Sequence, residues 1–248
     1  MTRISVELVP RDVEVLKEEV KTIKEKLSDV DFINIPDLLS CDTRSWDGAN
    51  IAKAYFDDVV PHLRAMDFDF TKELPIKDKL REYNIKEVLV IEGDPPQSML
   101  YQVYPTISTD IIKKFSEEMP EITVYAGIDQ YRSSMKEEEY RIRRKQLAGA
   151  KGFFTQPFFD MRYLEMYADL LDGLDIYWGV SPVLSERSVS YWRNKNNVIF
   201  PNYFEPTLEW NIEFARKVID FARKHNHNVY LMPIKAKIMP YLEGVFAK

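Results

Sequence analysis

Carboxylate and amide side chains recur in this sequence where short apolar runs break into turn residues. In residues 88–97, four aliphatic residues precede Glu92, Gly93, Asp94 and two prolines. A carboxylate that is partly buried at such a point resists ionisation, and its raised pKa suits a general acid near neutral pH. The side chains in this position are Glu7, Asp37, Asp67, Asp94, Asp129 and Gln156. They are our candidates for proton transfer and ligand binding.

The same residue types are also common in ordinary turns. Aspartate caps the segment that follows a strand, and glycine and proline adopt the backbone angles that turns require. The spacing of these residues therefore does not show which of them carry chemistry.

The elements that must position these side chains alternate along the chain. Runs rich in β-branched and aromatic residues predict strands. Between them, apolar residues at three-to-four spacing, with charges on the other face, predict helices. The predicted strands are residues 3–10, 31–37, 62–69, 87–94, 122–129, 152–158, 175–183 and 228–234. The clearest predicted helices are residues 12–27, 109–119, 137–150, 161–173 and 208–225.

This alternation over 248 residues predicts an α/β fold, a single-domain (β/α)8 TIM barrel spanning residues 1–248. The active site of such a barrel lies at the C-terminal ends of the strands, so we expect the polar strand ends to meet in one cavity. An open doubly wound sheet is the alternative, but the 8 glycines form no G-x-G-x-x-G or Walker pattern. Residues 184–208 are expected to be irregular and to cover one end of the barrel.

Composition narrows the class of protein. The formal net charge of −6 gives no basic stripe for a nucleic-acid backbone. The N-terminus does not resemble a signal peptide, and no apolar run is long enough to span a membrane. Cys41 is the only cysteine, which fits a reducing compartment. We therefore expect a cytoplasmic protein.

Two other features favour structural roles. His225 and His227 have a spacing that metals sometimes use, but they lie at a predicted helix end without an acidic or sulfur partner, so no metal site is expected. Cys41 lies near the predicted barrel mouth without an adjacent base, which favours an unreactive thiol.

Five motifs occur in the order and approximate spacing seen in methylenetetrahydrofolate reductases, and the whole chain resembles their catalytic barrel. The strand-six motif is the most specific of them. The motifs are "ISVELVP" (4–10), "PHL" (61–63), "IEGDPP" (91–96), "AGAKGFFTQPFFD" (148–160) and "GVSPV" (179–183).

The resemblance implies a flavin-dependent reduction of a folate methylene bridge to a methyl group. Glu7 matches the family's general acid, which protonates the departing ring nitrogen so that an iminium can form and accept hydride. Asp94 and Gln156 match residues that hydrogen-bond the pterin. Phe158, in the aromatic-rich strand-six motif, is expected to contact the substrate by stacking.

The resemblance also implies FAD as cofactor and NADH, NADPH or another electron donor. The residues expected to contact the cofactor are Thr43, His62, Asp94, Ala126, Arg144 and Lys145. The flavin half of the pattern departs from the family. The loop at residues 36–44 has no glycine, "GIDQYRSSM" replaces the family's Tyr-Pro-Glu-x-His segment, and Glu92 replaces an arginine.

These departures leave two other classes of function open. One is a flavin-free folate enzyme, either a direct nicotinamide reductase or a methyl-folate methyltransferase. The other is a non-catalytic subunit of a one-carbon complex, although Glu7, Asp94 and Gln156 are all retained. The chain is expected to form a homo-oligomer or a complex with an electron-donating protein.

Overall fold

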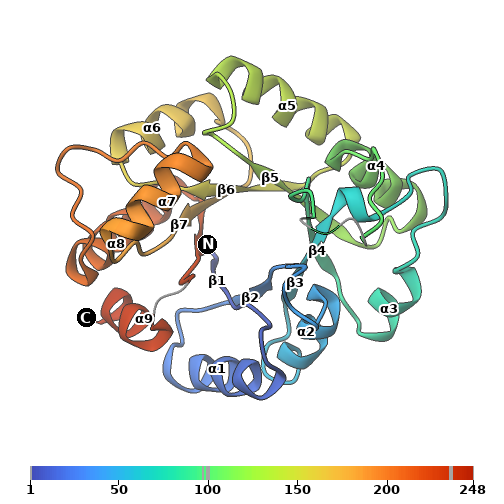
Figure 1. Cartoon of the computed structure of the whole chain (residues 1–248), viewed down its shortest axis with the longest axis horizontal. Coiled ribbons are helices and arrows are strands. Elements are labelled where there is room, and N and C mark those ends of the chain that lie inside the picture. The colour runs from blue at the N-terminus through green and yellow to red at the C-terminus, as the bar shows by residue number, and fades with distance from the viewer. Residues whose placement is uncertain (1, 97, 99–100, 235–236, 248) are drawn as a thin grey trace.

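The chain folds into a closed barrel of eight parallel strands in sequential order, β1 to β8, surrounded by helices (Figure 1). The computed structural model describes residues 2–96, 98, 101–234 and 237–247. The prediction of a (β/α)8 TIM barrel is confirmed. None of the helices in these residues is long and apolar enough to cross a membrane.

The elements alternate around the ring, with two helices between β7 and β8. The strands are β1 Ile4–Glu7, β2 Phe32–Ile35, β3 Val59–Arg64, β4 Glu87–Ile91, β5 Thr123–Ile128, β6 Gly152–Pro157, β7 Ile176–Val180 and β8 Asn228–Leu231. The helices are α1 Val13–Lys26, α2 Ser45–Ala52, α3 Lys77–Glu82, α4 Ser108–Glu118, α5 Met135–Ala148, α6 Met161–Leu170, α7 Glu186–Asn196, α8 Leu208–His225 and α9 Ile238–Phe246, with a 3-10 turn at Ala65–Asp67.

The third strand lies earlier than predicted. The prediction of residues 62–69 is wrong at both ends, because β3 covers Val59–Arg64 and the chain then enters a 3-10 turn. The strand includes Pro61, a residue that cannot donate to the strand ladder and that interrupts the β pattern in the sequence. Asp67 is consequently in the turn and not at a strand end.

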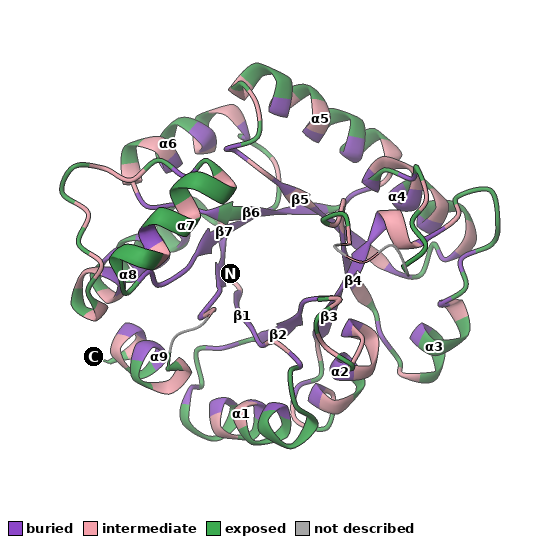
Figure 2. Ribbon diagram, in the orientation of Figure 1, coloured by how far each residue is buried: buried purple, intermediate pink, exposed green. Residues whose placement is uncertain are grey.

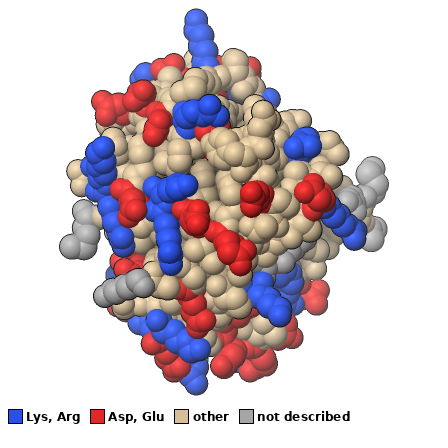
Figure 3. All heavy atoms as spheres, turned by 90° about the vertical axis from the view of Figure 1, so that its left-hand side faces the viewer, with Lys and Arg blue, Asp and Glu red and all other residues tan. Residues whose placement is uncertain are grey.

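Residues 184–208 are more regular than predicted, because they contain helix α7. The Oγ of Ser185 accepts a hydrogen bond from the backbone N–H of Ser188 at the start of α7, and Asn197 ends the helix in the left-handed conformation. The segment covers a separate aromatic cluster that includes Phe159, Phe200 and Phe204. Acidic and basic side chains are interspersed on this side of the molecule (Figure 3).

Two apolar layers hold the barrel together. The larger layer lies between the sheet and the helices, and the strands are buried along almost their whole length (Figure 2). The smaller layer fills the barrel interior, where Phe154 stacks on Tyr177 with ring centroids 4.1 Å apart. Arg3 reaches the interior at the N-terminal ends of the strands, where its guanidinium donates hydrogen bonds to the hydroxyls of Tyr125 and Tyr177. The C-terminal end of the barrel is thus the end at which a ligand can approach the strands.

Candidate active site

Glu7 ends β1 inside the barrel and is only 8% exposed. The hydroxyl of Tyr230, on the adjacent strand β8, donates a hydrogen bond to Oε2 of Glu7. Nδ1 of His62, on β3, lies 3.9 Å from the same oxygen. Glu7 therefore belongs to a buried polar cluster built from three strands.

Burial controls protonation in this cluster. It raises the pKa of Glu7 to about 7, although the Tyr230 hydrogen bond and the positive charge of Arg11 oppose the shift. It lowers the pKa of His62 to about 3. At neutral pH the His62 ring is thus uncharged, and its contact with Glu7 is not an ion pair. A carboxyl with a pKa near 7 can hold a proton and release it at physiological pH.

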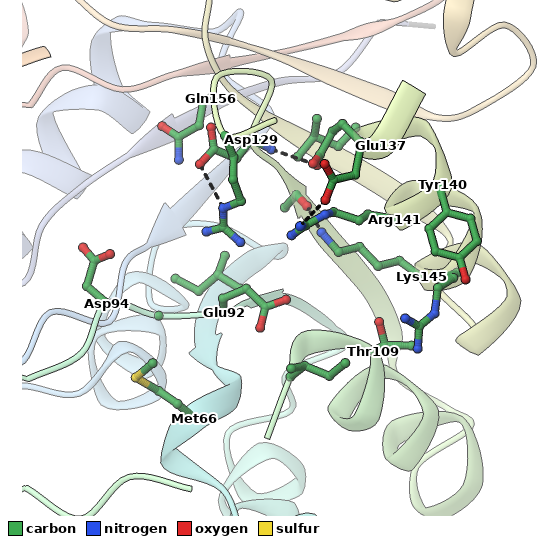
Figure 4. A pocket seen from close by; sticks show the side chains of 18 of the residues that line it. Met66, Glu92, Asp94, Thr109, Asp129, Glu137, Tyr140, Arg141, Lys145 and Gln156 are labelled. Atoms are coloured by element: carbon green, nitrogen blue, oxygen red, sulfur yellow. Dashed lines mark hydrogen bonds and ion pairs between the residues drawn. The ribbon is translucent and has the colours of Figure 1, made fainter. Parts of the chain in front are cut away.

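A cavity of about 730 Å³ opens beside the C-terminal ends of β4, β5 and β6. In Figure 4, Asp94 and Gln156 flank one end of it, and Tyr140, Arg141 and Lys145 from α5 flank the other. The cationic side chains in its wall are Arg132, Arg141, Arg144 and Lys145, and the carboxylates are Glu92, Asp94, Asp129, Glu137 and Glu138. This size and polarity suit an extended polar ligand.

Asp94 is exposed at the cavity because of the turn after β4. Gly93 adopts φ +86°, and a Cβ on it would lie 3.1 Å from Cβ of Arg64. Arg64 also donates to the backbone carbonyl of Asp94 at 2.8 Å, which fixes the turn. The Asp94 carboxylate has no hydrogen-bond or ion-pair partner among the described residues, so it is free to bind a ligand.

Gln156 faces the cavity at an irregularity in β6. The register of β6 against β7 shifts between Phe154 and Pro157. The Thr155 hydroxyl bridges the shift, accepting from the N–H of Gly179 at 2.8 Å and donating to the Gln156 carbonyl at 2.8 Å. A Cβ at Gly179 would lie 2.5 Å from the carbonyl oxygen of Thr155, so only glycine fits there. The Gln156 side-chain amide has no partner within the described part of the chain.

Helix α5 brings charged groups to the far end of the cavity. Nζ of Lys145 donates to the carbonyl of Gly127 at 2.6 Å, and burial lowers the pKa of this lysine. Arg144 is exposed, and the contact that its side chain makes with the described residues is a cation–π contact with Tyr140, 5.9 Å from the ring centroid. Glu138 is buried, and its Oε2 has no partner among the described residues. Arg144 therefore presents a cation at the cavity, and Glu138 holds an unsatisfied acceptor within the cavity wall.

Glu92, which stands where the family has an arginine, has a structural role. Its carboxylate accepts hydrogen bonds from the backbone N–H and the hydroxyl of Ser108, the first residue of α4. A negative charge is favourable at the N-terminus of a helix. Glu92 thus fixes the start of α4 at the edge of the cavity.

The six polar strand ends predicted from the sequence do not all meet in one cavity. Asp94, Asp129 and Gln156 line the 730 Å³ cavity, whereas Glu7 lies in the buried cluster. Asp37 and Asp67 are held by ion pairs with Arg44, at 2.5 Å and 2.8 Å. Asp67 also pairs with Arg64 at 3.2 Å, and neither aspartate lines the cavity, so the prediction that all six polar strand ends meet in one cavity is wrong.

Two predicted contact residues are core residues. Phe158 is fully buried and packs edge-on against Trp178 and Tyr167 in the layer outside the sheet. The side chain of Ala126 is fully buried in the same layer, and the following residue, Gly127, lines the cavity instead. We therefore correct both expectations, because these side chains point away from the mouth. Thr43 is half-buried in the loop before α2 and belongs neither to the lining of the 730 Å³ cavity nor to the buried cluster around Glu7.

Sequence inspection missed Asn34, Tyr230 and Glu138. A period of two along β2 and β8 would have placed Asn34 and Tyr230 on the same interior faces as Phe32 and Met232. Glu138 was hidden within a run of charged residues that resembles a solvated helix face. His227, considered above as a metal ligand, accepts a hydrogen bond at its Nδ1 from Nε1 of Trp178 at 3.0 Å.

Comparison with known proteins supports a resemblance to methylenetetrahydrofolate reductases. No family model matches the chain. The 5,10-methylenetetrahydrofolate reductase of Buchnera aphidicola subsp. Schizaphis graminum is 22% identical over 148 residues, which are 58% of this chain and 51% of that protein. The chain thus spans about half the length of the curated relative that it matches.

Solved structures share the barrel. An uncharacterized protein from Clostridium thermocellum that binds two copies of 5-methyl-5,6,7,8-tetrahydrofolic acid superposes with a TM-score of 0.65 at 14% identity, over 98% of this chain and 94% of that chain. A 2,3-dimethylmalate lyase superposes with a TM-score of 0.62 at 9% identity, over 96% and 76%. At these identities the likeness shows the fold alone.

Proposed function

We propose that this protein reduces the methylene group of a methylenetetrahydrofolate to a methyl group, with Glu7 as the general acid. The observation that carries the proposal is the buried Glu7 carboxyl, whose pKa of about 7 lets it hold a proton at neutral pH. The weak similarity to the Buchnera reductase and the methyl-folate that the Clostridium barrel binds support a folate as substrate.

The chemistry explains why a buried acid is needed. The methylene carbon of the substrate bridges two nitrogens in a five-membered ring, and it accepts hydride only after one C–N bond opens to give an iminium. Protonation of the departing nitrogen lowers the barrier to this opening. Glu7 supplies that proton, and Tyr230 holds its carboxyl in place.

Asp94 and Gln156 serve as the polar contacts for the pterin ring. The carboxylate accepts hydrogen bonds from N–H groups of the ring, and the amide both donates and accepts. Both side chains face the same cavity, and neither has a hydrogen-bond partner among the described residues. They can therefore bind a heterocycle without first breaking a hydrogen bond to those residues. This arrangement favours a ligand with both donors and acceptors on one edge.

The residues on α5 fit the proposal that FAD is the cofactor. Arg144 and Lys145 supply positive charge for phosphates, and the unpartnered Oε2 of Glu138 is suited to accept hydrogen bonds from sugar hydroxyls. A bound flavin would supply hydride after reduction by NADH, NADPH or another donor. The protein's own residues supply binding, orientation and the proton.

The loop at residues 36–44 favours a second candidate, a flavin-free folate enzyme. Arg44 is held by Asp37 and Asp67 and stacks on Trp46, with 4.6 Å between its guanidinium carbon and the ring centroid. A loop that is fixed in this way and has no glycine is poorly suited to a close backbone approach to a flavin ring. Such an enzyme would take hydride directly from a nicotinamide or transfer a methyl group.

The absorbance spectrum of the purified protein separates these candidates. We expect a yellow protein, or a colourless one that takes up added FAD, whose flavin absorbance is lost with NADH or NADPH under anaerobic conditions and returns on addition of methylenetetrahydrofolate. Methyl-folate formation without any flavin absorbance would favour the flavin-free enzyme. A protein that neither binds nor converts a folate would contradict the proposed function.

A further inference from the structure

We infer that Asn34 fixes the tautomer of His62 and thereby keeps Glu7 in its acid form. Asn34 lies on β2 directly opposite Glu7 in the strand register and is fully buried. Its Oδ1 lies 3.2 Å from Nε2 of His62. The three side chains form a chain from Asn34 through His62 to Glu7.

The hydrogen-bonding chemistry of the amide determines where the imidazole proton lies. A carbonyl oxygen only accepts hydrogen bonds, so Nε2 of His62 must donate to Oδ1 of Asn34. A neutral imidazole has one N–H, which leaves Nδ1 as a lone pair. Nδ1 is the atom that faces Oε2 of Glu7, at 3.9 Å. The lone pair offers no proton to the carboxylate.

The opposite tautomer would alter Glu7. An N–H on Nδ1 would point toward the carboxylate and stabilise its charged form, which lowers the pKa of a carboxyl group. Glu7 would then be ionised at neutral pH and would have no proton to donate. Within residues 2–96, 98, 101–234 and 237–247, the other titratable or charged groups close to Glu7 are Tyr230 on β8, and Arg11 and Glu19, which line a small cavity with Glu7. Asn34 is thus a positioning residue that acts through His62.

The Asn34 amide has a second feature, an unpaired nitrogen. Its Nδ2 is buried and has no hydrogen-bond partner among the described residues. An unpaired buried donor costs free energy unless a ligand or water satisfies it. The amide nitrogen of Asn34 is thus left unpaired within the described residues while its oxygen bonds His62.

Nuclear magnetic resonance can read the tautomer directly in the ligand-free protein. The chain has 3 histidines, so labelling histidine with ¹⁵N gives a spectrum that the variants His62→Phe and His225→Gln assign. We expect His62 to be neutral at pH 7 with its proton on Nε2. A proton on Nδ1 in the unmodified protein would overturn the inference, whatever the variants show.

The variant Asn34→Ala then tests the link to Glu7. We expect the proton to move to Nδ1 of His62 and the pKa of Glu7 to fall by about one unit, a roughly tenfold loss of proton affinity. The carbonyl stretch of protonated Glu7 in infrared spectra reports this pKa, with Glu7→Gln identifying the band. Phe32→Leu, on the same interior face of β2, is the control. It should change the melting temperature without changing the tautomer of His62 or the pKa of Glu7.

A coupled pair of variants excludes a purely structural effect. In a His62→Phe background, Asn34→Ala should not change the pKa of Glu7 further, because the residue through which Asn34 acts is gone. Asn34→Leu also removes the acceptor and keeps nearly the same side-chain size, so it should lower the pKa of Glu7 in the same way and serves if the alanine variant does not fold. An unchanged pKa of Glu7 in Asn34→Ala, or an equal fall in both backgrounds, would overturn the inference.

The inference rests on the proposed function only for its bearing on catalysis, through the role of Glu7 as the acid. The tautomer of His62 and the pKa of Glu7 are measured without substrate. Failure of the inference is therefore distinguishable from failure of the proposed function.

Discussion

The hydroxyl of Tyr230 donates a hydrogen bond to the carboxylate of Glu7 across the seam where β8 meets β1. Both side chains are buried, and burial raises the pKa of each, that of Tyr230 well above 10. The tyrosine therefore stays protonated and is the donor whenever Glu7 is ionised. Because a donated hydrogen bond favours the charged form of a carboxyl, Tyr230 limits how far burial raises the pKa of Glu7.

Removal of this donor should make Glu7 a weaker acid. In Tyr230→Phe we expect the pKa of Glu7 to rise above 7, so that the high-pH fall in folate reduction moves to higher pH. The measurement is the rate of methyl-folate formation against pH. Tyr177→Phe is the matched control, because its hydroxyl bonds Arg3 at the opposite end of the barrel. A Tyr230→Phe profile that moves to lower pH would contradict this role.

Glu7 should also make the stability of the protein depend on pH. Its pKa is 4.5 when unfolded and about 7 when folded, so between these values the folded state binds the extra proton. Stability from this group is therefore fully present below pH 4.5 and is lost as the pH rises through 7. The shift corresponds to roughly 3 kcal/mol of unfolding free energy.

Urea unfolding at pH 5 and pH 8 measures this effect. The free energy of unfolding of the unmodified protein should fall between the two conditions by more than that of Glu7→Gln, in which the titrating group is absent. The comparison between the two proteins removes the contributions of other groups. An equal pH dependence in both would show that the pKa of Glu7 is not raised.

Asp94→Asn should weaken folate binding while leaving the fold intact. The variant keeps the shape of the side chain but replaces one carboxylate oxygen, which accepts hydrogen bonds, with an NH₂ group, which donates them. This group would face the N–H donors of the ligand. We expect folate affinity to fall by about 1–3 kcal/mol, the cost of such unpaired buried groups. Folate titration and thermal melting on the same sample test this. Unchanged affinity with a large drop in melting temperature would show that Asp94 only forms the turn.

Arg144→Ala should weaken FAD binding, because the exposed guanidinium that lines the cavity is lost. We expect a roughly tenfold increase in the FAD dissociation constant, the scale of one charge-assisted contact. Arg143→Ala is the matched control, since Arg143 is the preceding residue on α5, pairs with Glu139 and does not line the cavity. Equal effects of both substitutions would indicate nonspecific electrostatics.

The sequence predicted the barrel well because its strands are short apolar runs with turn residues after them. It placed Glu7, Asp94 and Gln156 at the C-terminal end of the strands, where the structure has them. It failed for Asp37 and Asp67, because both carboxylates pair with Arg44, 7 and 23 residues away in the chain. The conformation of the intervening loops brings these groups together, and a strand or helix pattern does not encode it.

Side-chain direction was the other source of error. Phe158 follows β6 within an aromatic-rich run of this sequence, but the register shift before Pro157 turns it into the outer layer. The helices α2 and α3 are short, with 8 and 6 residues, and give too few turns for a clear periodic signal. The Asn34 contact with His62 joins two strands and depends on their register.

The most direct test of the central claim compares Glu7→Gln with the unmodified protein in the two halves of the proposed reaction. With FAD bound, anaerobic stopped-flow absorbance follows reduction of the flavin by NADH or NADPH, and then its reoxidation by methylenetetrahydrofolate. We predict that Glu7→Gln reduces the flavin at the normal rate but reoxidises it roughly a hundredfold more slowly or worse, the scale of a lost general acid. Reoxidation by the folate at the same rate in both proteins would contradict the proposal that Glu7 donates the proton.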